Sequence, residues 1–243
     1  MLNFKPIPPS DGSDAAIAAI VNASPDRPFV VAQLGQSLDG RIATPTGESR
    51  WINRDAALDH VHRLRAAVDA VVVGIGTALA DDPILNVRRV PGRHPARVVI
   101  DPNRRLPGTA RCLSADDGAP RIVVRSCDTP AENGVEAIRV EGERLACGRT
   151  NMPPRAIVDA LFKRGFRKLL IEGGATTVSA FIDAGVVDRL HVLVAPVILG
   201  SGKTGLSLAP IERLSEAYRP ETDVYVLSDG DVLFDCKLKA HGA

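Results

Sequence analysis

The segment LLIEGGATT, residues 169–177, is the clearest structural signal in the chain. A short apolar run ends in an acid, two glycines follow, and a helical stretch begins at once, which predicts a strand, a tight turn and a helix. Free N–H groups at a helix start favour an anion, and glycines let a phosphate come close. Glu172, at the strand end, is a candidate for orienting a substrate or handling a proton. A tight turn with a solvated glutamate fits the same residues equally well.

Strands and helices alternate on either side of this segment. This alternation favours a single α/β domain with a mostly parallel central sheet and helices on both faces. Asp229 and Gly230 indicate the turn of a C-terminal antiparallel hairpin within residues 223–238. Residues 1–27, rich in Pro, Ser, Asp and Ala, are interpreted as an N-terminal extension or linker, and residues 28–243 as one domain whose ordered core begins at Phe29. Strands are predicted over 29–34, 70–73, 97–101, 121–125, 137–140, 168–172 and 189–194, and helices over 53–68, 153–165 and 176–184.

A second segment, VVVGIGTALADDP at residues 71–83, starts like a dinucleotide fingerprint. Leu79 stands where its third glycine would be, and Pro83 stops any long helix, so a conventional Rossmann unit is disfavoured. The segment can still form a loop against a cofactor, with Thr77 and Asp81 as hydrogen-bonding groups. A plain connection is the alternative.

A third segment, TGESRWI at residues 46–52, holds the only tryptophan, Trp51, in a polar loop. A lone loop tryptophan is more often a packing residue than a cofactor contact. Asn53 is predicted to cap the helix that follows. Arg65 lies on that helix and Arg88 lies beyond the Asp-Asp-Pro turn; taken alone, each is ordinarily a surface charge.

Composition limits the classes of function. The chain has 243 residues and a formal net charge of +1, which gives no sign of a nucleic-acid or membrane partner. The four cysteines form no C-x-x-C pair, and we expect free thiols in a cytoplasmic protein. His60 and His62 are two apart on a helix and diverge, so no metal site is expected. Serine-hydrolase, P-loop and zinc-deaminase motifs are not found.

Nine motifs occur in a fixed order: SLDGRIA (37–43), TGESRWI (46–52), LR (64–65), GIGT (74–77), ADDP (80–83), VID (99–101), EGG (172–174), AGVVD (184–188) and APVILG (195–200). In this order they resemble the reductase domain of bifunctional riboflavin biosynthesis deaminase–reductases. The resemblance implies a dihydrofolate-reductase-like fold, usually in a homodimer. It also implies hydride transfer from NADPH to the ribosyl carbon of a 5-amino-6-(5-phosphoribosylamino)uracil, as its open-chain imine, giving the ribitylamino product. Fungal and archaeal relatives reduce the corresponding diaminopyrimidinone.

The resemblance implies a role for individual residues by position. Glu172 would orient the pyrimidine or the reacting ribose, Arg65, Arg88 and Ser49 would hold the substrate phosphate, and Asp39 would build a turn. The substrate-contacting positions are Gln33, Ser49, Arg65, Leu85 and Arg88. The cofactor-contacting positions are Gly35, Trp51, Thr77, Asp81, Gly173, Gly174, Ala175, Thr176, Thr177, Val178, Ser179 and Ala180.

Two positions depart from the family pattern. Gln33 stands where a lysine is usual, and Pro102 stands where a serine is frequent, so that only its carbonyl remains as a contact. Asn103, Arg104 and Arg105 follow and are candidates for meeting the 2′-phosphate of NADPH. A paralogous reductase of another pyrimidine or of a pterin such as dihydrofolate, and a non-catalytic nucleotide-binding protein, are the alternatives.

Overall fold

A computed structural model describes residues 2–4, 12–127, 134–144 and 150–238, with side chains from Ala15 onward. Cys147 lies outside the described residues; Cys112, Cys127 and Cys236 are free thiols. The strands of the main sheet are β1 (Leu2–Phe4), β2 (Phe29–Ser37), β4 (Ala70–Gly74), β5 (Ala96–Ile100), β6 (Arg121–Arg125), β7 (Glu136–Arg139), β10 (Lys168–Ile171), β11 (Arg189–Ala195), β13 (Glu221–Val226) and β14 (Val232–Lys237).

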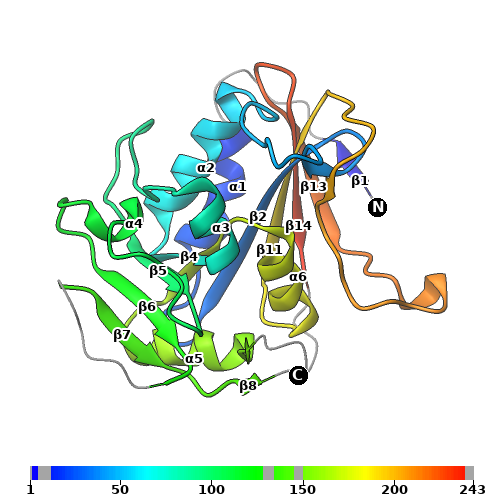
Figure 1. The fold of residues 1–243 in the computed structure, drawn as a ribbon. Helices are drawn as coiled ribbons and strands as arrows, with labels where there is room; N and C mark the ends of the chain where they lie inside the picture. The colour runs from blue at the N-terminus through cyan, green and yellow to red at the C-terminus, as the bar shows by residue number, and fades with distance from the viewer. Residues whose placement is uncertain (1, 5–11, 128–133, 145–149, 239–243) are drawn as a thin grey trace.

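Within the described residues the main sheet has ten strands in the order β1-β13-β14-β11-β2-β10-β4-β5-β6-β7 (Figure 1). The run from β11 through β7 is parallel, and β14 pairs antiparallel with both β11 and β13. The predicted α/β class, the mostly parallel sheet and the C-terminal antiparallel hairpin are thereby confirmed. Short two-residue and three-residue strands form two further pairs: β3 (Arg41–Ala43) with β12 (Lys203–Thr204), and β8 (Glu143–Arg144) with β9 (Thr150–Asn151).

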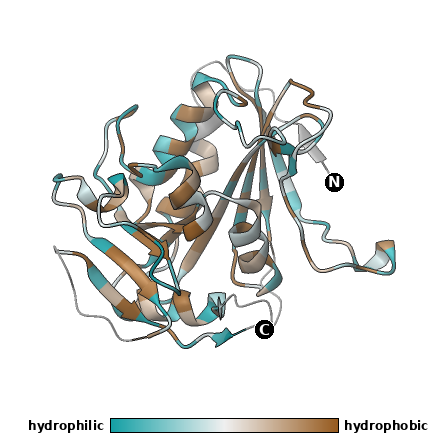
Figure 2. Ribbon diagram, in the orientation of Figure 1, coloured by the Kyte–Doolittle hydropathy of each residue, from teal (hydrophilic) through white to brown (hydrophobic). Residues whose placement is uncertain are grey.

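Helices cover both faces of this sheet. They are α1 (Gly12–Val21), α2 (Asp55–Ala67), α3 (Ile75–Asp81), α4 (Arg111–Ser114), α5 (Pro154–Lys163), α6 (Ala175–Asp183) and the 3₁₀ turn η1 (Leu214–Glu216). Side chains of α5 and α6 pack on Val30 and Val72, whereas α1 to α4 pack on Val31 and Val71. Because successive strand residues face opposite sides, a strand covered on both faces must be apolar throughout. The hydrophobic colour along the central strands in Figure 2 follows from this.

The N-terminal part of the chain joins the core earlier than the expected start at Phe29. Ala16 and Ile20 of α1 are fully buried, and β1 pairs in parallel with β13. Two apolar side chains four residues apart lie on one face of a helix, so a short helix suffices to bury them. Within the described residues, no helix is long and apolar enough to cross a membrane.

The segment after β4 also differs from the expected loop. Gly74 is extended, and helix α3 begins at the next residue and ends at Asp81. Asp82 follows with a left-handed backbone (φ 38°), and Pro83 prevents continuation. The chain therefore makes two strand–helix units, β4–α3 and β10–α6, each with a glycine at the N-cap of its helix.

The start of α2 corrects the predicted Asn53 cap. The N-cap residue is Arg54, with an extended backbone and no side-chain cap hydrogen bond. Two carboxylates of the distant β13–β14 turn take the N–H groups instead: Asp231 accepts from the backbone N–H of Arg54 (2.9 Å) and Asp229 from that of Ala56 (2.7 Å). Negative groups at a helix start are favourable, so the C-terminal hairpin fixes this end of α2.

Candidate functional site

Two adjoining cavities open at the carboxyl ends of the parallel strands. The small chamber, about 300 Å³, has Asn53, Leu58, Arg65, Leu85 and Glu172 among its walls. The large chamber, about 660 Å³, is walled by glycines of both strand–helix turns and extends to residues 100–105 and to Lys203. Ligands of open α/β sheets bind outside the carboxyl ends of the strands, where helix starts and loops meet. The position of both chambers is that of a binding site.

The two chambers share part of their lining, so they form one continuous site. The common residues are Gln33, Ser49, Thr77, Asp81 and Gly173. Asp81 lies at this junction. Partial burial raises the pKa of its carboxyl, and this effect exceeds the lowering by the positive charges of Arg50 and Lys203.

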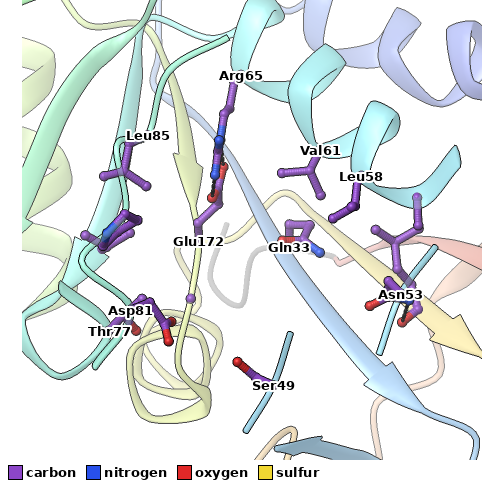
Figure 3. A pocket seen from close by; sticks show the side chains of 15 residues that line it. Gln33, Ser49, Asn53, Leu58, Val61, Arg65, Thr77, Asp81, Leu85 and Glu172 are labelled. Carbon is purple, nitrogen blue, oxygen red and sulfur yellow. Dashed lines mark hydrogen bonds and ion pairs between the residues drawn. The ribbon is translucent and has the colours of Figure 1, made fainter. Parts of the chain in front are cut away.

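A buried ion pair closes one side of the small chamber. Arg65 of α2 donates from Nε to Oε1 of Glu172 (2.7 Å) and from Nη2 to Oε2 (2.6 Å), and its Nη1 donates to the carbonyl of Asn86 (3.1 Å). The two residues are 8% and 6% exposed, and Figure 3 shows them facing one another across the chamber wall. Burial alone would lower the pKa of Arg65, but the Glu172 carboxylate raises it, so the guanidinium stays charged.

This geometry revises the role that the sequence gives Arg65. A guanidinium that uses two edges on Glu172 and Asn86 is a holder of Glu172 rather than a free phosphate clamp. Leu85 is 2% exposed in a left-handed backbone (φ 59°) and lines the chamber, as Ser49 and Gln33 do.

Arg88 lies outside the lining of both chambers, beside this ion pair. Its backbone N–H donates to Nδ1 of His62 (3.1 Å), and its Nη1 donates to Oδ1 of Asn86 (3.0 Å). Burial and the charge of Arg65 lower the pKa of His62 to about 4, so the ring is neutral near pH 7 and can accept this bond. Arg88 is exposed as a whole residue, but its guanidinium is partly desolvated. This desolvation and the charges of Arg65 and Arg111 lower the pKa of Arg88. An anion would relieve this crowding of positive charge.

The two strand–helix turns meet in the wall of the large chamber. A Cβ on Gly173 (φ 91°) would lie 2.6 Å from Thr77, and one on Gly74 would lie 2.3 Å from Oγ1 of Thr177. The backbone N–H of Gly174 donates to Oγ1 of Thr77 (2.7 Å). Each turn therefore needs glycine because a threonine of the other turn fills the space.

Gly74→Ala is expected to lower the free energy of unfolding by about 1–3 kcal/mol, because overpacking must push the turns apart. The double variant Gly74→Ala with Thr177→Ala removes the colliding hydroxyl and should recover most of the loss. Gly76→Ala is the matched control, since a Cβ there meets nothing within 4 Å. Urea unfolding of the variants measures the effect, and a fully stable Gly74→Ala protein would contradict this packing.

The structure gathers most predicted cofactor positions at the large chamber. Those that line it are Gly35, Thr77, Asp81, Gly173, Gly174, Thr176, Thr177 and Ala180. Trp51 is 82% exposed and lines neither chamber, and Val178 is fully buried in the core. Ser179 accepts a hydrogen bond from the backbone N–H of Ser207 (2.9 Å), and Ala175 is outside the lining.

Several site residues were missed from the sequence. Lys203 and Thr150 line the large chamber, and Asn53 lines the small one. Lys203 belongs to a two-residue strand with no local signal. Of the three residues expected to meet a 2′-phosphate, Asn103 and Arg105 line the large chamber and Arg104 does not. Pro102 also lines it, and its carbonyl accepts a hydrogen bond from the Ser126 hydroxyl (2.9 Å).

Asp39 builds a turn, as predicted. Its Oδ1 accepts from the Ser37 hydroxyl (2.7 Å) and the Leu199 N–H (3.0 Å), and Oδ2 accepts from the Gly200 N–H (2.8 Å). These bonds, the Ser37 hydroxyl first, lower the pKa of Asp39 to about 2. Asp39 thus links two of the nine family motifs, SLDGRIA and APVILG, by hydrogen bonds.

Comparison with known proteins gives the family. The model of the RibD C-terminal domain matches residues 28–224. The chain belongs to this family. It is 37% identical over 200 residues to the 2,5-diamino-6-ribosylamino-4(3H)-pyrimidinone 5′-phosphate reductase of Methanothermobacter thermautotrophicus, covering 80% of this chain and 91% of that protein. It is 34% identical to the riboflavin biosynthesis protein RibD of Aquifex aeolicus, covering 73% of this chain and 49% of that longer protein. The chain is therefore an oxidoreductase, a reductase of the riboflavin-biosynthesis type.

Solved structures agree with this assignment. A deaminase/5-amino-6-(5-phosphoribosylamino)uracil reductase from Thermotoga maritima superposes with a TM-score of 0.73 at 29% identity, covering 87% of this chain and 57% of that chain. The riboflavin biosynthesis reductase of Saccharomyces cerevisiae has a TM-score of 0.67 at 21% identity, over 89% and 92% of the two chains, and shows that the fold is shared.

The large chamber fits the nicotinamide dinucleotide that a reductase of this type requires. In the first turn of α6 the N–H of Thr177 bonds back to the carbonyl of the N-cap residue Gly174 (3.0 Å), and the N–H groups before it have no carbonyl within the helix to reach. They adjoin Gly173 and Gly174, whose backbone a phosphate can approach. Gly76 lines the chamber, and a Cβ there would enter open space. Lys203 and Arg105 add positive charge to the lining. Within the described residues, no group of three or more His, Cys, Asp or Glu could hold a metal ion.

Proposed function

We propose that this chain reduces the ribosyl group of a 5-amino-6-(5-phosphoribosylamino)pyrimidine to the ribitylamino product, with NADPH as reductant. The substrate is the uracil or the diaminopyrimidinone equivalent, the second being what the Methanothermobacter relative is named for. The observation that carries the proposal is that the two chambers share lining residues. The small chamber contains the Arg65–Glu172 pair, and the large chamber is walled by the glycines of both strand–helix turns. A reductase needs this arrangement because cofactor and substrate must meet at one point.

The small chamber is then the substrate site. Glu172, held by Nε and Nη2 of Arg65, is fixed in direction and orients the pyrimidine or the ribose hydroxyls. Leu85 and the apolar wall from α2 contact the ring, and Gln33 and Ser49 face the junction where the ribosyl carbon must lie. Bound NADPH would supply the hydride, and the protein supplies position and electrostatics.

The large chamber is the cofactor site. Gly173, Gly174 and the first turn of α6 would hold the diphosphate, and Thr77 and Asp81 would lie near the nicotinamide end because both also face the substrate. Arg105 and Asn103 at the other end would meet the 2′-phosphate, so NADPH should be preferred over NADH.

The test is steady-state oxidation of NADPH and NADH with three substrates: the deaminated pyrimidine, the diaminopyrimidinone and dihydrofolate. We expect turnover of at least one ribosylaminopyrimidine 5′-phosphate, with a product that has gained two hydrogens by mass spectrometry. Turnover of dihydrofolate alone would replace the proposal with a pterin reductase. Equal kcat/KM with NADPH and NADH would remove the role given to Arg105.

A further inference from the structure

The orientation of the Asn53 amide is fixed from outside the small chamber. Its Nδ2 donates to the carbonyl of Leu193 (3.3 Å) on β11 and to Oδ2 of Asp231 (3.1 Å) on the C-terminal hairpin. A backbone carbonyl and a carboxylate are both acceptors, so the atom between them must be the amide nitrogen. Asp231 is fully buried and cannot turn to solvent for another donor.

The amide oxygen of Asn53 therefore points away from these two acceptors and lies against Gly35, a residue of the large-chamber lining. A Cβ at Gly35 would lie 2.2 Å from this Oδ1, so the glycine leaves the space that the oxygen occupies. Within the described part of the chain, Oδ1 receives no hydrogen bond. Both N–H groups of the amide are used, so a rotation that presented a donor instead would break two bonds.

Asn53 is set apart from the other polar side chains of the small chamber. Of the lining residues that the large chamber does not share, the polar ones are Asn53, Arg65 and Glu172. Each oxygen of Glu172 already accepts a hydrogen bond from Arg65, whereas the Asn53 oxygen accepts none from the described residues and is a second acceptor for a ligand. Figure 3 places it on the side of the chamber opposite Leu85 and Asp81.

We infer that Asn53 is a specificity-determining residue that selects a pyrimidine carrying an amino group at C2, the diaminopyrimidinone, over its deaminated uracil counterpart. The inference rests on the proposed function. The two substrates differ at C2, where one has an N–H donor and the other a carbonyl acceptor. The ribosylamino group must face the junction of the chambers, so the ring, with C2, fills the part that Asn53 lines. A fixed acceptor pairs with the amino group and repels the carbonyl.

The experiment compares kcat/KM for the two ribosylaminopyrimidine phosphates in wild type and in Asn53→Ala. Wild type should prefer the diaminopyrimidinone. Asn53→Ala should lower kcat/KM on that substrate about three- to tenfold, the size of one neutral hydrogen bond, without lowering it on the uracil. Leu58→Ala is the matched control, because it removes an apolar wall of the same chamber and should affect both substrates alike.

A second variant keeps the test decisive where Asn53→Ala unfolds. In Asp231→Asn the partner can donate as well as accept, so the Asn53 amide can turn, and the preference for the diaminopyrimidinone should shrink. A wild-type preference for the uracil, or an unchanged ratio in both variants, would overturn the inference and leave the proposed function standing. No turnover of either substrate by wild type would instead reject the proposed function.

Discussion

Glu172→Ala is expected to lower the free energy of unfolding by about 3–5 kcal/mol, because it leaves a buried guanidinium without its counter-charge. Arg65 is 8% exposed and makes two of its three recorded side-chain hydrogen bonds to Glu172. The raised pKa of Arg65 depends on that carboxylate, and Asn86 offers a single carbonyl in compensation. Thermal or urea unfolding at neutral pH measures the loss.

The matched control replaces both partners. Arg65→Met with Glu172→Met removes the pair and fills its space with apolar side chains, so stability should return to near the wild-type value, as replacements of buried ion pairs often do. A loss below about 1 kcal/mol in the single variant, the range of exposed pairs, would mean that water reaches Arg65. With the single variants Arg65→Met and Glu172→Met, the double variant forms a cycle that isolates the interaction energy of the pair.

Activity should separate from stability in this series. The double methionine variant is expected to fold and to bind NADPH, yet to lose on the order of a hundredfold in kcat/KM, since misplaced substrate alone can cost that much. Glu172→Gln keeps the shape but weakens the bonds to Arg65, so it should lie between wild type and Glu172→Ala in stability. Full activity of the methionine pair would show that Glu172 serves the fold alone.

The sequence predicted those parts of the fold and site that depend on neighbouring residues. The run of apolar residues before Glu172 and the two glycines after it gave β10, its turn and α6, because strand, turn and helix signals are local. Asp229 and Gly230 gave the hairpin turn for the same reason; Gly230 has φ 96°. The pattern that predicted the turn of Asp39 was likewise contained within a few residues.

Features that depend on tertiary contacts could not be predicted from the sequence. Arg65 and Glu172 are 107 positions apart, and nothing in either segment shows that one holds the other. Asn53 carries the typical cap residue type, but Asp229 and Asp231 supply the cap from the far end of the chain, which frees Asn53 for the chamber. Local propensity is overridden where a distant element offers better-placed acceptors. Trp51 is a different case: the family resemblance predicts a cofactor contact, but Trp51 lines neither chamber in this structure.

Arg88→Ala is expected to weaken binding of the phosphorylated substrate about ten- to a hundredfold, because a hydrogen bond to a charged group contributes about 1.5–3 kcal/mol. His62 and Asn86 hold Arg88 beside the small chamber, and the charges of Arg65 and Arg111 make the place favourable to an anion. The phosphate is remote from the reacting carbon, so most of the loss should fall on KM. NADPH affinity should change little.

Arg89→Ala is the control for Arg88→Ala, since Arg89 is adjacent in sequence but is paired with Asp59 (2.6 Å) and Asp55 (2.8 Å) on α2. Its loss should leave substrate affinity nearly unchanged. The decisive measurement uses the same pyrimidine with and without its phosphate. Wild type should strongly prefer the phosphorylated form, and Arg88→Ala should lose most of that preference. Equal use of both forms by wild type would contradict a phosphate site at Arg88, because a guanidinium that binds a dianion must discriminate against the neutral hydroxyl.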